Sequence, residues 1–282
     1  MAAQIQPTDI KLHYVTIVEA KKMSGLRLVL GAYPVPGPWR EACKGLFYVK
    51  GIPYKPVVTG NEGTSDLQIG MDDSQSELVA WTGQASAPVA IWNDELPRSK
   101  WIDQLNLAER LGPEPRLIPE DSGLRMQMFG LINELAGENG LLWLKRLGMA
   151  HGPLQSLPEG HEGRAFWEFL GAKYGYTPER AEAAPARIVN TLNSFHEQFD
   201  TQNSRGSKYL IGDSLTAVDI YWSTTCGLLD PLPDDLCPMT SGFRNPSAYG
   251  CDNAEIDKAL TPELRAHREF IYNDYLELPI VF

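Results

Sequence analysis

The chain has 282 residues, of which 43% are hydrophobic and 22% charged, and its formal net charge is −11. This composition suits a chain with a buried core and excludes disorder as the overall state, and the length fits two domains of modest size. Acidic side chains number 36 against 25 basic ones, and Lys and Arg form no block. We therefore expect no nucleic-acid partner, because binding to phosphates requires clustered positive charge.

The apolar segments are too short to span a bilayer. Leu26–Ala32 is one such run, whereas a membrane helix needs about 20 apolar residues. The first six residues have neither the basic start nor the apolar stretch of an export signal. We expect a cytoplasmic protein without a membrane partner.

Cysteine and histidine spacing predicts no metal site. The four cysteines are scattered, with no CxxC pair, and the five histidines show no HExxH or HxH spacing. Cys226, Cys237 and Cys251 could in principle share a site, but we interpret the cysteines as free thiols.

The N-terminal third predicts a small mixed α and β domain. Residues 1–24 show weak periodicity and are interpreted as an extension. Leu26–Ala32 predicts a buried strand, a helix is expected from Pro38 to Gly51, and Tyr54–Val58 predicts a second strand. A strand, helix and strand at this spacing form a βαβ unit, in which the two strands run parallel.

A third strand and a domain boundary follow. Pro88–Trp92 predicts a strand, and Ser99–Leu111 an amphipathic helix. The cluster Gly112–Pro115 disfavours helix and marks the boundary. We expect residues 25–111 to form the first domain and residues 112–282 the second.

The second domain is expected to be all-helical. Leu124, Met128, Leu131 and Leu135 repeat with helical period, and strand patterns are lacking. Thr216 and Asp219 have the spacing of a reciprocal helix cap, in which the Asp219 carboxylate accepts from the Thr216 amide.

Four segments, in this order and spacing, resemble the glutathione transferase family: Lys50–Tyr54, Ala87–Val89, Arg98–Ile102 and Tyr209–Asp219. The resemblance implies a thioredoxin-like N-terminal domain, βαβ followed by ββα, and an all-α C-terminal domain. It also implies glutathione as co-substrate, no metal, and a homodimer.

The resemblance also implies where glutathione is held. Pro88 would be cis, and the backbone of Val89 would pair with the cysteinyl part of glutathione as an added strand. Ser99 falls where the family holds the γ-glutamyl carboxylate, since the N-terminus of a helix suits an anion. The alternative is that Ser99 is only a helix cap. Arg98 replaces the usual acid or Gln, and an Arg there would grip a carboxylate with two hydrogen bonds.

The reacting end departs from the family pattern. The catalytic Ser or Cys of many members falls on Gly37, which has no side chain to offer. Tyr33 falls where tyrosine-type members keep their phenol; equally, Tyr33 is an aromatic residue that closes the strand. We rank Tyr33 first as the group that stabilises the thiolate, then Arg40 and the Gly37 amide, and we place Trp39 beside the sulfur.

An energy estimate favours the phenol. Holding a thiol of pKa ~8.5 as thiolate at neutral pH requires about 2.7 kcal/mol. A charge-assisted hydrogen bond contributes ~1.5–3 kcal/mol and a helix N-terminus ~0.3–1 kcal/mol. The helix alone is therefore insufficient.

Two functions follow from these patterns. The first is a transferase whose glutathione thiolate attacks a small, hydrophobic electrophile in a pocket of the helical domain. By position, the candidate pocket residues are Met126, Phe129, Asn133 and Trp143. The second is a binding or regulatory protein that keeps the fold and has lost the catalytic Ser or Cys.

Overall fold

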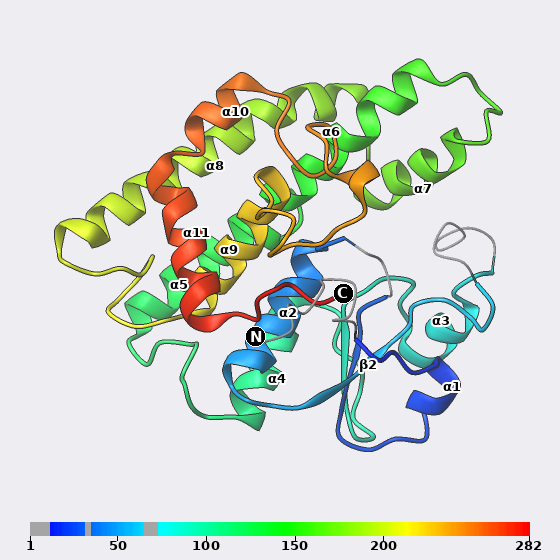
Figure 1. The fold of residues 1–282 in the computed structure, drawn as a ribbon, viewed down its shortest axis with the longest axis horizontal. Helices are drawn as coiled ribbons and strands as arrows, with labels where there is room; N and C mark the ends of the chain where they lie inside the picture. Colours follow the sequence, from blue (N-terminus) through cyan, green and yellow to red (C-terminus); the bar gives the residue numbers. More distant parts are fainter. Residues whose placement is uncertain (1–11, 32–34, 65–72) are drawn as a thin grey trace, which may run out of the picture. The chain divides into compact units, whose positions relative to one another are not determined.

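The computed structural model describes residues 12–31, 35–64 and 73–282. The chain forms two compact units (Figure 1). The first comprises Met1–Pro115, Pro231–Phe243 and Tyr272–Phe282, and the second Arg116–Asp230 and Arg244–Ile271. The first unit therefore includes two segments from late in the chain.

A three-stranded mixed sheet forms the centre of the first unit. Its strands are β1 (Leu26–Val29), β2 (Tyr54–Val57) and β3 (Val89–Trp92), in the order β2-β1-β3. β1 pairs parallel with β2 and antiparallel with β3. Every residue of β1 is buried because it is the central strand. The predicted βαβ unit with parallel strands is confirmed.

The expected second β-hairpin is reduced. Among the described residues, the strand that would follow β3 is a single antiparallel bridge between Ala90 and Arg98. The thioredoxin-like topology is kept, but its last strand is only one residue pair long.

Residues 12–24 belong to the first unit and pack beside its sheet. Val15 forms a parallel bridge with Val57, which extends the sheet beyond β2. The short helix α1 (Ile17–Ala20) begins at a Thr16–Glu19 capping box. Ile17 and Ala20 then join the core beside the sheet.

Three further helices complete the early part of this unit. They are α2 (Pro38–Val49), α3 (Ser76–Thr82) and α4 (Trp101–Leu111). After α2, the buried Lys50 ammonium pairs with Glu109 at 2.7 Å and donates to the carbonyls of Gly112 and Pro115. Lys50 thus joins the end of α2 to α4 and to the Pro-rich segment after it.

The described residues of the second unit form helices joined by loops, with no strand among them, as predicted for an all-helical domain. Its helices are α5 (Ser122–Ala136), α6 (Leu141–Ser156), α7 (Arg164–Tyr174), α8 (Pro178–Ser204), α9 (Ala217–Leu229), α10 (Ala254–Ala259) and most of α11 (Pro262–Tyr275). α8 packs against α6 and α10 (Figure 1). The remaining short helix, the 3-10 turn Ser241–Phe243, belongs to the first unit.

Asp219 organises the start of α9. Its carboxylate accepts from the Thr216 amide at 2.9 Å, as the sequence predicted, and from the Leu210 amide at 2.8 Å. His267 of α11 contributes Nε2 at 3.1 Å. Asp219 and His267 are both fully buried side chains. The cap is therefore also the point where α11 attaches to α9.

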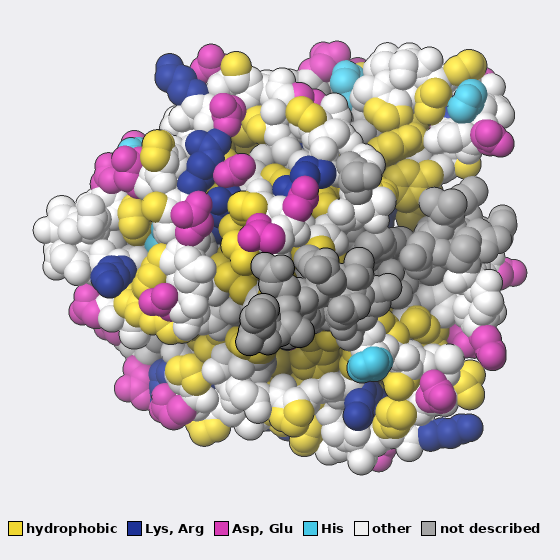
Figure 2. All heavy atoms as spheres, in the orientation of Figure 1, with side chains coloured by type: hydrophobic (Ala, Val, Ile, Leu, Met, Phe, Trp, Pro, Cys, Tyr) yellow, Lys and Arg dark blue, Asp and Glu magenta, His cyan; other side chains and the backbone are white. Residues whose placement is uncertain are grey.

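The visible surface has mixed charge. On the face in Figure 2, Lys and Arg side chains are interspersed with Asp and Glu rather than gathered in one patch. Arg265, for example, pairs with Asp257 at 2.6 Å and with Asp230 at 3.1 Å. No helix within the described residues is both long and apolar enough to cross a bilayer.

Candidate functional site

Arg40 links the end of β1 to the start of α2. Its guanidinium Nη1 donates to the carbonyls of Leu30 at 2.8 Å and Gly31 at 2.9 Å, and Nη2 donates to the Val35 carbonyl. Only 8% of Arg40 is exposed. Because carbonyls from both sides hold the group, a positive charge is fixed at the N-terminus of α2.

Gly37 is the N-cap of α2 and gives no side-chain cap. A Cβ built on Gly37 would lie 2.6 Å from Arg40 Nε, which is closer than real Cβ contacts. A Ser or Cys at this position therefore requires Arg40 to move. The guanidinium occupies the space in which a catalytic Ser or Cys side chain would begin.

The Gly37 amide is engaged within the loop. It donates to the Val35 carbonyl at 2.9 Å. Its role as a thiolate donor stays a prediction, and it would require the amide to leave the Val35 carbonyl. Trp39, in the first turn of α2, is half-buried.

Tyr33, the first-ranked phenol, lies outside the described residues. A different phenol, on Tyr14, donates to the Gly31 carbonyl at 2.7 Å and thus shares this acceptor with Arg40. Sequence reasoning missed Tyr14, because no local signal shows that the N-terminal extension returns to the end of β1.

The hydrogen bonds of β3 do not fit the predicted pairing of the Val89 main chain with glutathione. The Ala87–Pro88 bond is cis, as the resemblance implied. Ala90 exchanges two hydrogen bonds with Arg98, both 2.9 Å. Main-chain groups alternate in direction along a strand, so those of Val89 point toward β1, where Val89 pairs with Val29. They are therefore not available to an added strand.

Ala87 lies two residues before this strand, on the N-terminal side of the cis proline. In the described part of the chain, its amide and carbonyl have no hydrogen-bond partner. The residue is half-buried. An extended peptide can therefore pair here, one residue before the cis proline.

Arg98 and Ser99 lie together at the approach to α4. The Arg98 guanidinium pairs with Glu95 at 2.6 Å, and Arg110 pairs with the same carboxylate at 2.5 Å. Ser99 is half-buried, and α4 begins at Trp101 with Lys100 as its N-cap. The alternative interpretation of Ser99 as the helix cap was therefore wrong, since the cap lies one residue later.

The four candidate pocket residues fall into two groups. Met126, Phe129 and Asn133 follow one another along α5, and Met126 is 70% exposed. Trp143 belongs to α6, where its indole donates to the Tyr174 carbonyl at 2.8 Å. Trp143 thus contributes to the contact between α6 and α7.

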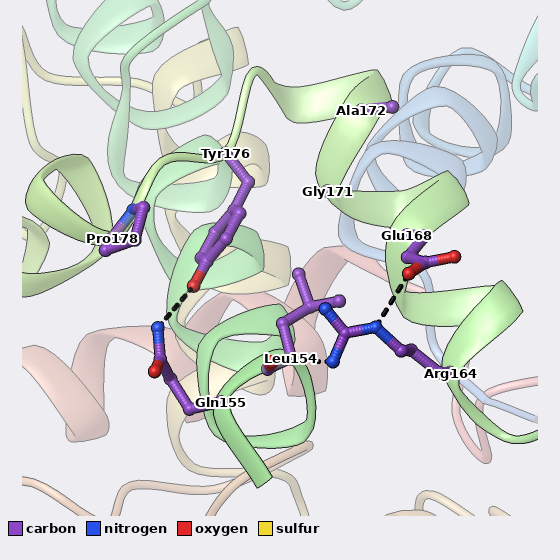
Figure 3. A pocket seen from close by; sticks show the side chains of 8 residues that line it. All are labelled: Leu154, Gln155, Arg164, Glu168, Gly171, Ala172, Tyr176 and Pro178. Carbon is purple, nitrogen blue, oxygen red and sulfur yellow. Dashed lines mark hydrogen bonds and ion pairs between the residues drawn. The ribbon is translucent and has the colours of Figure 1, made fainter. Parts of the chain in front are cut away.

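A cavity of about 350 Å³ lies among α6, α7 and the start of α8 (Figure 3). Figure 3 shows Tyr176 turned toward Gln155, whereas Arg164 is turned toward Glu168. Because the two charged lining groups pair with each other, the cavity has an amphipathic wall without uncompensated charge. None of the four predicted pocket residues lines it.

The buried cysteines are poor nucleophiles. Burial raises the pKa of the Cys43 thiol, and Glu41 raises it further. Burial likewise raises the pKa of Cys226 to about 12. A thiolate is the reactive form of cysteine, so neither thiol is activated at neutral pH. Among the described residues, no group of three His, Cys, Asp or Glu side chains is placed to hold a metal.

No protein-family model and no curated protein matches the sequence. Solved structures do match. A glutathione S-transferase from Methylobacterium radiotolerans, in complex with glutathione sulfonate, gives a TM-score of 0.55 at 13% identity and covers 89% of this chain and 92% of its own. One from Methylobacillus flagellatus with glutathione bound gives 0.55 at 13% identity, with coverage of 88% and 95%.

A beta-etherase from Sphingobium sp. strain SYK-6 gives a TM-score of 0.53 at 16% identity, with coverage of 87% of this chain and 99% of its own. These comparisons show that the chain has the glutathione transferase fold. The fold predicted from the four sequence segments is therefore confirmed.

Proposed function

We propose that the chain is a glutathione-dependent transferase that holds glutathione as its thiolate and presents it to a small, largely apolar electrophile. The observation that carries this proposal is the guanidinium of Arg40, fixed at the N-terminus of α2 where a Ser or Cys side chain would otherwise begin. The fold supports it, because two similar structures hold glutathione or its sulfonate.

Glutathione would be held as an added strand. The free amide and carbonyl of Ala87 suit its cysteinyl unit. We assign the γ-glutamyl carboxylate to Ser99 and the N-terminus of α4. Arg98 would contribute only by sharing its guanidinium with Glu95, since that pair already exists.

Three contributions would stabilise the thiolate: the Tyr33 phenol, the charge of Arg40 and the dipole of α2. The thiolate attacks the electrophilic carbon, a carbon–sulfur bond forms, and the bond to the leaving group breaks with its electron pair. The protein supplies orientation and charge stabilisation, with no nucleophile of its own.

Replacing Tyr33 with Phe tests the phenol directly. Because one hydroxyl is removed, we expect at least a tenfold loss of turnover with glutathione affinity nearly intact, measured with a model electrophile and by calorimetry. Unchanged turnover would transfer the role to Arg40.

The ultraviolet band of bound thiolate tests Arg40. We expect Arg40→Met to weaken this band at neutral pH. Arg27→Met is the matched control: Arg27 is also buried and donates to main-chain carbonyls, including that of Ala20 at 3.1 Å. If both variants lose the band equally, the loss reflects general destabilisation and contradicts the role of Arg40.

The alternative, a binding or regulatory protein, predicts a different result. Such a protein would bind glutathione without the thiolate band. Absence of glutathione binding would contradict both functions.

A further inference from the structure

Three cations gather where α6 meets α7 and the loop after α9. Lys145 and Arg146 are consecutive on α6, and Lys173 is in the last turn of α7. Arg146 acts electrostatically on both lysines, and Arg146 and Lys173 both contact Tyr174. All three belong to the second unit.

The charge of Lys145 is compensated by neighbouring groups of the chain. Its ammonium donates to the carbonyls of Gly250 at 2.9 Å and Pro246 at 3.3 Å. Asp252 provides a negative charge nearby. Lys145 therefore holds the loop of residues 246–250 on α6, and this loop brings Tyr249 to Arg146.

Arg146 and Lys173 lack such compensation. Arg146 hydrogen-bonds with the phenols of Tyr174 and Tyr249 and touches the Met149 sulfur at 3.1 Å. The Lys173 ammonium lies 5.5 Å from the centre of the Tyr174 ring. In the described residues, no carboxylate pairs with either cation, and neutral phenols cannot balance their charge.

The missing compensation affects the pKa of Lys173. Loss of hydration among the surrounding protein atoms, with repulsion from Arg146, lowers the pKa of Lys173 to about 8. Lys173 is nevertheless exposed and Arg146 is half-buried, so both are open to a ligand from solvent. Although the net charge of the chain is −11, no carboxylate of the described residues forms an ion pair with Arg146 or Lys173.

We propose that Arg146 and Lys173 form a binding site for a small organic carboxylate with a flat apolar body. The guanidinium fork and the ammonium suit one carboxylate group. The apolar body would lie against Trp143, which is half-buried and meets the buried Tyr174 ring edge-on at 4.8 Å. The site is independent of glutathione and of the proposed transfer reaction.

Chemical modification of lysine tests the site with phenylacetate as probe. The lowered pKa of Lys173 leaves more of its amine uncharged and reactive at pH 8 than in an ordinary lysine. A bound carboxylate favours the charged ammonium, so we expect at least a threefold slower acetylation of Lys173, measured by peptide mass spectrometry. The neutral phenylacetamide should give no protection.

Lys208 provides the matched control, since its ammonium lies 5.6 Å from the centre of the Phe270 ring. Its acetylation should be unaffected by phenylacetate, and Lys208→Gln should bind phenylacetate as the wild type does. Arg146→Gln should abolish protection of Lys173. Lys173→Gln, a change at an exposed residue, should weaken phenylacetate binding at least fivefold by calorimetry.

Several outcomes would overturn the proposal. They are unprotected Lys173 in the wild type, protection that survives Arg146→Gln, or equal protection by phenylacetamide. Equal protection by inorganic phosphate would show that the site takes charge alone, and would overturn the assignment of an organic ligand.

Discussion

At the scale of single residues, the position of the Arg40 side chain explains why residue 37 is a glycine. The backbone at Gly37 has φ −62° and ψ 116°, a conformation that any residue adopts. Glycine is therefore required there by space and not by backbone geometry. The space is taken by Arg40 Nε.

A double-mutant cycle tests this reciprocity. Gly37→Ser alone should cost about 1–3 kcal/mol of unfolding free energy, because the new Cβ meets a guanidinium held by carbonyls. In an Arg40→Ala background the same serine should be tolerated, giving a coupling of about 1 kcal/mol or more in urea unfolding. Gly130→Ser is the control, since a Cβ there has no contact within 4 Å. Additive losses would contradict the clash.

Sequence counting named a candidate site, and its role stays a prediction. It placed the family's catalytic position on Gly37 and identified Arg40 as a cation nearby, and both lie at the start of α2. It could not show the direction of hydrogen bonds. The Gly37 amide is used by Val35 and the Val89 groups point to β1, and neither fact is encoded in residue type.

At the scale of elements, the start of α9 depends on a buried charge. Asp219 accepts from two backbone amides and from the Thr216 hydroxyl, and it also meets His267. The spacing of Thr216 and Asp219 was enough to predict the cap. The contact with α11 was not predictable, because it joins residues 48 positions apart.

Asp219→Ala should therefore destabilise the chain strongly. Removing one member of a buried pair leaves the other groups without partners, and we expect a loss of about 3–5 kcal/mol in urea unfolding. Asp213→Ala, an exposed acid in the preceding loop, should change stability by no more than about 0.5 kcal/mol. Comparable effects of the two changes would contradict the role of the buried network.

Strands and helices were predicted well where periodicity and breakers were clear. All three strands and α2 begin within one residue of their expected starts, and β1 ends three residues earlier than expected. The last strand of the thioredoxin-like topology was expected from the resemblance and is only the Ala90–Arg98 bridge. The chain turns at Asn93–Asp94 directly after β3, so few residues remain before α4 to form this last strand.

At the scale of the whole molecule, the first unit is built from both ends of the sequence. Lys44 of α2 is buried and pairs with Glu41 at 3.0 Å, lies 3.8 Å from Glu277, and donates to the Val281 carbonyl. The Ile280 amide donates to the Leu236 carbonyl at 2.8 Å. No local pattern predicted that these late segments would pack with the first third of the chain.

Lys44→Met should lower stability by about 3 kcal/mol at pH 8, because two carboxylates lose their cation. Burial raises the pKa of Glu277 above its usual range; Lys44 opposes this shift, and Glu41 adds to it. A carboxyl with a raised pKa costs stability once ionised, so the loss should shrink as pH falls from 8 to 5.

Lys55→Met, a change at an exposed lysine of β2, is the control and should be neutral to within about 0.5 kcal/mol. A loss in Lys44→Met that is independent of pH would contradict the electrostatic explanation.

The attachment of Val281 to Lys44 has a consequence for biosynthesis. A ribosome delivers α2 more than two hundred residues before the carbonyl that Lys44 binds. Domains that emerge first usually finish folding first, but here α2 must wait for a segment made much later. Until Val281 has been synthesised, the Lys44 ammonium has Glu41 as its charged partner among the described residues of the early chain, and the surface that later covers it is exposed to chaperones.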